Sequence, residues 1–192
     1  MGQARLPSSA HTSRPWRVHE ITADFRLEDV WALPVRGEQG EFHALVEGFA
    51  AGDPAQSSWP VRALWEIRWK LGELLGWDRA QAGLGERVAT LRGRLPADLL
   101  DAPGPAFDTL PFTSLYLVED EFAAEIANQT MHGVLHLGWV AEEGGGYRGQ
   151  MAVCVRPNGL LGRAYMAAIK PFRHLVVYPQ MLRTMERRWQ ER

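Results

Sequence analysis

The sequence predicts an α+β fold in which one face of a curved antiparallel sheet packs against a long C-terminal helix. From Thr113 to Arg156, apolar residues recur at every second position, which is typical of strands with one buried face. From Pro157 to Trp189, they recur at steps of three, four and seven, which is typical of an amphipathic helix. At 192 residues, the chain is long enough to bury the core of one ordinary domain without a disulfide or a metal.

The first fifty residues are predicted to contain a tail, two strands and a helix. Residues 1–14 are small, polar and charged, so we expect a flexible tail that is loose unless it docks, followed by a single domain over residues 15–192. Trp16–Ile21 alternates weakly and predicts a short strand. Asp29–Val35 predicts a first or edge strand, because a proline lies near its end. Glu41–Ala51 has its apolar residues on one side and predicts a helix.

A second helix is predicted over Trp59–Trp77, with Ser58 in the N-cap position. Its polar residues form one narrow stripe, and Arg68 falls in the middle of the opposite, apolar side. A buried guanidinium needs a carboxylate, carbonyl oxygens or a bound anion, unless it reaches past the edge of the core. Arg68 is therefore either part of a structural ion pair or an anchor for a ligand. Glycines and prolines from Asp78 to Pro105 predict a long connector that could contain one short helical turn.

Four strands are predicted in the second half of the chain, where they form an antiparallel meander. They are Leu115–Asp120, Phe122–Ala127, Met131–Val140 and Tyr147–Val155. A turn near Gly144 places His132 opposite Arg156 in the last strand. The alternation gives the sheet one apolar face, expected toward the C-terminal helix, and one charged face.

The charged face brings glutamates and histidines together if the first hairpin turns at residues 128 and 129. Glu125 then lies opposite His132, and Glu121 lies opposite His136. Each pair is either an exposed cross-strand ladder or a catalytic pair in which the carboxylate orients the imidazole. The alternation favours the ladder, but whether this face meets solvent or a cavity stays open. Cys154 lies on the same face without a partner motif, so we expect a buried or semi-buried thiol.

The C-terminal helix is predicted to begin after Asn158, whose side chain can accept from the first free N–H groups. Pro171 and Pro179 lie inside the helical pattern, and each removes a backbone donor. Two bends or breaks are therefore expected in this helix. His174 lies among basic residues of the helix and is expected at the surface.

Composition and spacing argue against several classes of function. The 21 basic and 23 acidic residues give a net charge of −2, which argues against nucleic acid as the main partner. The sequence contains no signal peptide and no apolar run of about 18 residues, so we expect a cytoplasmic protein without a membrane span.

His132 and His136 are about 13 Å apart along a strand, too far to bind one ion. The G-x-G-x-x-G match from Gly144 to Gly149 continues as a strand rather than a helix. We expect neither a metal nor a cofactor.

Three short stretches carry a resemblance to a known family, namely Phe25–Trp31, Ile67–Gly72 and Lys170–Leu175. Through them the chain resembles an uncharacterised bacterial domain-of-unknown-function family, which is found elsewhere appended to short-chain-dehydrogenase-like NAD(P)-binding domains. The predicted order of elements resembles the helix-grip fold of the START-like or Bet v 1-like (SRPBCC) superfamily. The resemblance implies a ligand cavity between sheet and C-terminal helix, with two shorter helices after the first strand. It carries over no catalytic residues, and it implies that an accessory role to an oxidoreductase would need a separate partner protein.

The favoured function is the binding of a small apolar or amphipathic molecule in this cavity, with Arg68 as the anchor for a ligand carboxylate. The predicted lining of the cavity consists of Leu135, Leu137, Trp139, Met151, Val153, Leu161, Tyr165 and Phe172.

Two other functions stay open. An enzyme of the same superfamily type, such as a lyase, cyclase or hydrolase, would use Arg68, Glu119 or Tyr165 inside the cavity. Glu119 is a candidate because it alternates with leucines and could point inward at the rim. An interaction module would dock on an oxidoreductase, or on a second copy of the chain, through exposed tryptophans such as Trp59, Trp77 and Trp189.

Overall fold

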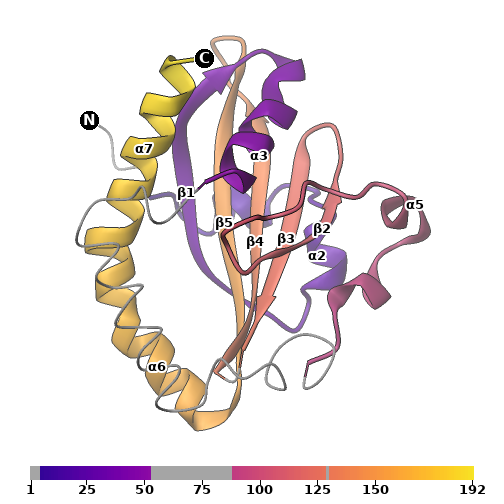
Figure 1. The fold of residues 1–192 in the computed structure, drawn as a ribbon, viewed down its shortest axis with the longest axis vertical. Coiled ribbons are helices and arrows are strands. Elements are labelled where there is room, and N and C mark those ends of the chain that lie inside the picture. Colours follow the sequence, from indigo (N-terminus) through magenta and orange to yellow (C-terminus); the bar gives the residue numbers. More distant parts are fainter. Residues whose placement is uncertain (1–4, 53–87, 129) are drawn as a thin grey trace.

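A five-stranded antiparallel sheet forms the middle layer of the fold, and helices cover both of its faces (Figure 1). The computed structural model describes residues 5–52, 88–128 and 130–192. The strands are β1 (Arg26–Gly37), β2 (Thr113–Leu117), β3 (Glu121–Ala127), β4 (Met131–Ala141) and β5 (Tyr147–Pro157). They lie in the order β1-β5-β4-β3-β2, so β1 and β2 form the edges. The mixed α+β class predicted from the sequence is confirmed.

The four predicted meander strands are confirmed, and β1 is longer than expected. β1 runs for 12 residues and pairs with β5 in the sheet, and Arg5 forms an isolated bridge with its Trp31. Pro34 is exposed within it, which an edge strand tolerates because one side of its backbone has no ladder to complete. In the β4–β5 pair, His132 lies opposite Arg156 and His136 opposite Ala152, as the turn near Gly144 predicts.

The strand predicted over Trp16–Ile21 is wrong, because this segment contains the short helix α2 (Val18–Ile21). Val18 and Ile21 are both fully buried, which their three-residue spacing allows on one side of a helical turn. The carboxylate of Glu121 accepts hydrogen bonds from the backbone N–H groups of Arg17 and Val18, each at 2.8 Å. A distant side chain thus satisfies the free N–H groups that begin this helix.

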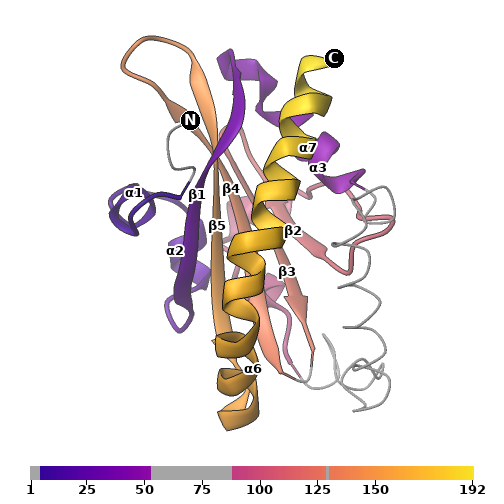
Figure 2. The same ribbon diagram turned by 90° about the vertical axis from the view of Figure 1, so that its left-hand side faces the viewer.

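The predicted C-terminal helix consists of α6 (Gly159–Phe172), the π-helical turn η5 (Arg173–Val177) and α7 (Tyr178–Gln190). The three segments continue as one curved helix that crosses the sheet (Figure 2). Pro171 precedes the π turn and Pro179 follows it, so the two expected bends are replaced by one wide turn. A π turn accommodates a local break in the regular ladder without ending the helix.

Both faces of the sheet are buried, so the charged face is not a solvent-exposed ladder. The first core joins one face to α3 (Phe42–Ala50) and α7. The second core joins the opposite face to α2 and to the segment around η4 (Leu91–Arg94) and α5 (Ala97–Leu100). Figure 2 shows α1 (Ser9–Thr12) and α2 on one side of the sheet, with α3 and the C-terminal helix on the other.

Residues 1–14 are expected to form a tail that is loose unless it docks. From residue 5 onward, this segment docks on the sheet. The backbone N–H of Leu6 donates to the carbonyl of Val30 at 2.8 Å. Gln150 donates from its side chain to the carbonyl of Ala10 at 3.2 Å, and His11 is only 1% exposed. The segment therefore passes the edge of β1 and continues over the second face.

The two helices expected after the first strand have different outcomes. The first is confirmed as α3, preceded by the short turn η1 (Gln39–Glu41). The second, Trp59–Trp77, lies outside the described residues. From residue 88 onward, the predicted connector contains η4 and α5 instead of one turn. Within the described ranges, no helix combines the length and the apolar character that a membrane span requires.

Candidate functional site

Four of the predicted lining residues lie in the first core, where α7 covers them. Leu135, Leu137, Trp139 and Met151 are buried, and they belong to the same apolar cluster as Tyr178 and Leu182 of α7. The ring of Trp139 lies 6.3 Å from that of Trp189, and its indole N–H donates to the carbonyl of Glu38 at 2.9 Å. In this half of the layer, the sheet and the helix are packed together.

The half of the layer toward α6 is less closed among the described residues. Val153 and Phe172, both predicted to line the site, are only partly buried. On the same face as Val153, Ile126 and Met131 flank Gly133 and are also partly buried. Arg68 lies outside the described residues, and so do the side chains of Leu161 and Tyr165. Together with the buried Val155 between them, these partly exposed apolar residues form a floor between this part of the sheet and α6.

A buried aspartate in β1 borders this floor. Asp29 lies directly after an irregularity in the β1–β5 register and is paired with Val153. Its side chain is 0% exposed although it carries a carboxylate. A buried carboxylate is unfavourable unless charged or polar groups surround it, so the partners of Asp29 define the local chemistry.

Three side chains from the π turn and α7 converge on Asp29. Arg173 donates from Nη2 to Oδ2, and His174 places Nε2 2.7 Å from Oδ1. Tyr178 donates its hydroxyl to Oδ2 at 3.2 Å. From the N-terminal segment, Arg5 places Nη2 3.7 Å from Oδ1. We call Asp29, Arg173, His174 and Tyr178 the Asp29 cluster.

The π turn and the register irregularity explain why these residues meet. A π turn adds a residue to one turn of helix and re-aims the side chains around it, and such turns occur frequently at functional sites. Here Arg173 and His174 are the first two residues of the turn, and both side chains point at the same carboxylate. His174, expected at the surface, is partly buried, with 18% of its side chain exposed, because it contacts Asp29.

The Asp29 cluster combines a held carboxylate with groups that keep unused hydrogen-bonding capacity. Burial, and then the charge of Asp29, raise the pKa of Tyr178, so its hydroxyl stays protonated and donates. Arg173 Nε is buried and has no hydrogen-bond partner among the described residues. Among the described residues, His174 Nδ1 has no polar partner. The His174 ring contacts Trp31 edge-on, with the two ring centroids 5.9 Å apart.

The predicted glutamate–histidine pairs form on the opposite face, in a different register from that expected. Glu125 lies opposite Val134 and Glu121 opposite Gly138, two residues from the predicted positions. The side chains still meet diagonally, because the offset keeps them on one face. His132 Nε2 lies 2.8 Å from Glu125 Oε2.

The second of these pairs extends into a group of histidines, in which His11 and His136 are buried and His19 is partly buried. His136 Nε2 lies 3.1 Å from Glu121 Oε1, and His136 Nδ1 lies 3.2 Å from His11 Nε2. The ring of His19 is 4.8 Å from that of His11. Gly138 leaves space for Trp16 over this cluster, because a Cβ there would stand 2.8 Å from the indole. Burial, followed by the charges of the neighbouring histidines, lowers the pKa of His11 to about 3.

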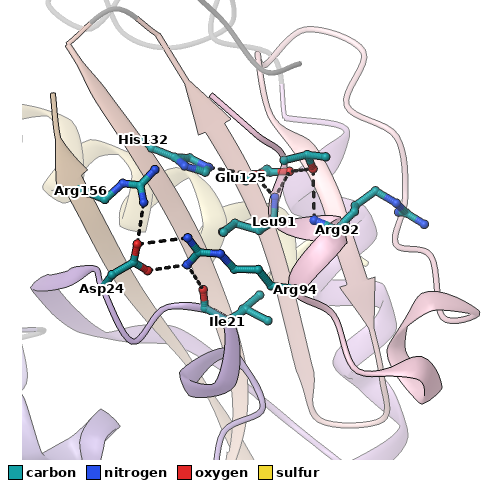
Figure 3. Close-up of polar contacts among 9 residues, drawn as sticks. Ile21, Asp24, Leu91, Arg92, Arg94, Glu125, His132 and Arg156 are labelled. Carbon is teal, nitrogen blue, oxygen red and sulfur yellow. Dashed lines mark hydrogen bonds and ion pairs between the residues drawn. The ribbon is translucent and has the colours of Figure 1, made fainter. Parts of the chain in front are cut away.

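The two glutamates act as anchors for the segments that cover this face. Glu125 accepts from the hydroxyl of Thr90 and from the backbone N–H of Leu91, so it ties η4 to the sheet (Figure 3). Burial alone would raise the pKa of Glu125, but its hydrogen bonds to His132 and Thr90 outweigh burial and lower it. The interpretation as an exposed ladder is wrong, since both carboxylates and both β4 histidines are buried.

An ion-pair group at the end of the same face closes this cover. Asp24 pairs with Arg94 at 2.5 Å and with Arg156 at 2.6 Å, and Arg94 also donates to the carbonyl of Ile21 (Figure 3). Arg94 first, and Arg156 after it, hold the pKa of Asp24 well below its usual range. The Glu–His pairs are thus sealed beneath α1, α2 and η4, and they do not face the apolar floor.

The remaining candidates from the sequence lie away from the Asp29 cluster. Glu119 is exposed in the turn between β2 and β3, where it accepts from Gln39 at 2.7 Å, because the strand ends before it. Cys154 is buried as expected, and burial raises its pKa to about 11, so the thiol stays protonated at neutral pH. In the described ranges, no group of three or more histidines, cysteines or acids could hold a metal ion.

Sequence reasoning did not select the Asp29 cluster, although two stretches that carry the family resemblance contain most of it. Asp29 belongs to Phe25–Trp31, and Arg173 and His174 belong to Lys170–Leu175. A usable signal was the charged residue inside an otherwise apolar strand. Asp29 precedes Val30 and Trp31 at the position where a buried strand residue is expected.

A family model described as "Protein of unknown function (DUF2867)" matches residues 21–180 of the chain. The matched range contains the whole Asp29 cluster, whereas Arg5 and His11 lie before it. No curated protein and no solved structure matches the chain significantly. The description names no activity, so the function has to be argued from the geometry.

Proposed function

We propose that the chain, which belongs to the DUF2867 family, binds a small amphipathic molecule between the sheet and α6. In this proposal, the apolar part of the ligand lies on the floor around Val153, and its polar end meets the Asp29 cluster. This is the favoured function from the sequence, with the polar anchor moved from Arg68 to residues that the structure describes.

One observation carries the proposal, namely that Asp29 and Val153 are direct neighbours across β1 and β5. A polar cluster with unused hydrogen-bonding groups therefore borders a floor of partly buried apolar side chains. Ligand sites in proteins typically combine an apolar lining with a few convergent polar groups. Three ring and guanidinium side chains held by one carboxylate are also pre-organised, which reduces the ordering cost of binding.

We further propose that the sheet and the C-terminal helix form the helix-grip arrangement of the START-like or Bet v 1-like superfamily. The supporting features are the antiparallel sheet, the long terminal helix that crosses it, and the partly open half under α6. The second layer of short helices on the far face would be an addition to that arrangement.

A second candidate function is general-base catalysis at the same place, and the Asp29–His174 contact favours it. An Asp oxygen 2.7 Å from Nε2 fixes the ring and leaves Nδ1 for a substrate, as in catalytic pairs where a carboxylate orients a histidine. The third candidate, docking through tryptophans, has less support. Trp59 and Trp77 lie outside the described residues, and Trp189 is engaged, since its indole donates to the carbonyl of Arg36 at 2.8 Å.

The test of ligand binding is a titration with straight-chain alcohols and fatty acids, followed by native mass spectrometry and tryptophan fluorescence. Val153→Lys places a charge on the floor, and Val118→Lys is the matched control, because Val118 is a partly buried valine of the opposite core. We expect the wild type and Val118→Lys to bind alike, and Val153→Lys to bind at least about tenfold more weakly. Absence of binding by the folded wild type, or equal binding by both variants, would refute the proposal.

A further inference from the structure

We infer that the polar end of the ligand is an anion, a carboxylate in the first instance, and that Arg173 is its anchor. This inference rests on the proposed ligand-binding function and specifies the chemical class of the ligand. It follows from the charges around Asp29, from the unused donors of Arg173, and from the partial exposure of the arginine.

The charges around Asp29 leave an excess of positive charge. One carboxylate, that of Asp29, lies within ion-pair distance of both Arg5 and Arg173. Next to Asp29 in the chain, Glu28 lies within ion-pair distance of both Arg26 (3.7 Å) and Lys170 (3.8 Å), so this neighbouring group does not offset the excess. Among the described residues, Asp29, Arg5 and Arg173 together carry one net positive charge before any charge on His174 is counted. A site of this sign attracts an anionic group and disfavours an ammonium group.

Arg173 retains donors that a carboxylate could use. A guanidinium carries five N–H donors in a planar fork. Asp29 accepts from Nη2, while Nε is buried and has no partner in the described part of the chain. A buried donor without a partner is unfavourable, so a ligand that accepts from it gains more than the same contact would yield in water. Arginine binds carboxylates through two parallel hydrogen bonds, and Nε with a terminal nitrogen forms one such pair of donors.

Asp29 and Tyr178 hold this fork in place, while Nε stays without a partner among the described residues. Asp29 holds Nη2 from the sheet side, and the ring of Tyr178 lies 5.6 Å from the guanidinium carbon, within range of a cation–π contact. The Arg173 side chain is 15% exposed, so it is fixed in place but still reached from solvent. Such an arrangement keeps the guanidinium oriented for an incoming anion, which lowers the ordering cost of binding.

The choice between a charged and a neutral ligand is testable with two molecules of equal chain length, decanoate and decanol. Calorimetry at about pH 8, where the fatty acid is ionised, gives both affinities on the same wild-type protein. We expect decanoate to bind at least about tenfold more tightly than decanol, and the difference to decrease as salt is added. If an ordered water, and not the ligand, accepts from Arg173 Nε, decanoate and decanol should bind with equal affinity.

Two variants assign the preference to the arginine. Arg173→Gln leaves Asp29 buried without its main partner, so Asp29→Asn/Arg173→Gln, which removes both charges together, is prepared beside it. We expect both to bind decanoate and decanol within about threefold of each other. Arg183→Gln, an exposed arginine of α7, is the control and should keep the wild-type preference.

The outcomes separate this inference from the function on which it rests. Equal binding of decanoate and decanol by the wild type overturns the anionic ligand, and a preference that survives in the folded double variant overturns Arg173 as its anchor. Both results leave the binding function intact. Binding of neither molecule, nor of any other straight-chain ligand, removes the proposed function itself. A preference for decanoate that disappears in the double variant and persists in Arg183→Gln supports both.

Discussion

His11 is the position at which the structure predicts a measurable dependence of stability on pH. The side chain is 1% exposed, and burial lowers its pKa from 6.5 to about 3, with further contributions from His136 and His19 that Glu121 only partly opposes. In the unfolded chain, His11 binds a proton below its ordinary pKa, whereas in the folded protein it stays neutral until about pH 3. Stability therefore decreases as the pH falls through the interval between these two values.

The size of the effect follows from the two pKa values. Linkage over the interval from pH 7 to pH 5, with values of 6.5 unfolded and about 3 folded, gives a loss of about 2 kcal/mol. The full shift corresponds to about 5 kcal/mol, which is reached only below about pH 3. The lowered pKa values of Glu121 and Glu125 also reduce stability on acidification, but mainly below their ordinary value of 4.5. The interval from pH 7 to pH 5 therefore isolates the histidine contribution.

The assay is urea denaturation at both pH values for the wild type and for His11→Gln, which cannot titrate. We expect the free energy of unfolding of the wild type to decrease by about 2 kcal/mol more than that of the variant. His43→Gln is the control, since His43 is exposed on α3 and should leave the wild-type pH dependence unchanged. If the wild type and His11→Gln lose the same free energy between the two pH values, His11 is not held neutral by the fold and the reasoning is refuted.

Two further substitutions test how the covering segments and α6 are held. Glu121→Gln removes the charge that accepts from a tyrosine hydroxyl and two backbone N–H groups. We therefore expect the free energy of unfolding, measured by urea denaturation, to decrease by about 3 kcal/mol. The control is Glu119→Gln at an exposed position, which should lower it by less than about 0.5 kcal/mol. Similar losses for both would show that the buried acceptor is dispensable. Gly162→Val places a Cβ 2.1 Å from the carbonyl oxygen of Thr130, and we expect it to cost about 1–3 kcal/mol by the same measurement, whereas Gly93→Ala meets open space and should be neutral.

The strands were predictable from the sequence because burial on a sheet repeats every two residues, but the register of one hairpin was not. The β4–β5 register is correct, since glycines with positive φ at Gly145 and Gly146 mark the turn. The β3–β4 register differs by two residues from that expected. Asn128 accepts with its side chain from the backbone N–H groups of Thr130 and Met131, and this local turn chemistry moves the tip of the hairpin.

The burial of the charged face could not be read from its alternation. Charged residues at every second position look the same whether water or another segment of the chain satisfies them. Here the carboxylates of Glu121 and Glu125 accept hydrogen bonds from the backbone N–H groups of Arg17, Val18 and Leu91. These donors lie in segments that are far away in the sequence and have no clear periodicity. Tertiary hydrogen bonds to backbone N–H groups leave no trace in the pattern of side chains.

The two faces of the sheet use buried carboxylates in opposite ways, and this difference decides where a ligand is sought. Glu125 is closed in by the backbone N–H of Leu91, the hydroxyl of Thr90 and a histidine that is itself 0% exposed, so its hydrogen-bonding capacity serves the fold. Asp29 is held by side chains that reach the surface, and Arg173 keeps donors that no described residue uses. His132 Nδ1 also has no hydrogen-bond partner among the described residues, but it is sealed in the core, whereas the Arg173 side chain is 15% exposed. A partly exposed polar group with unused donors, beside an apolar floor, is what a binding site requires.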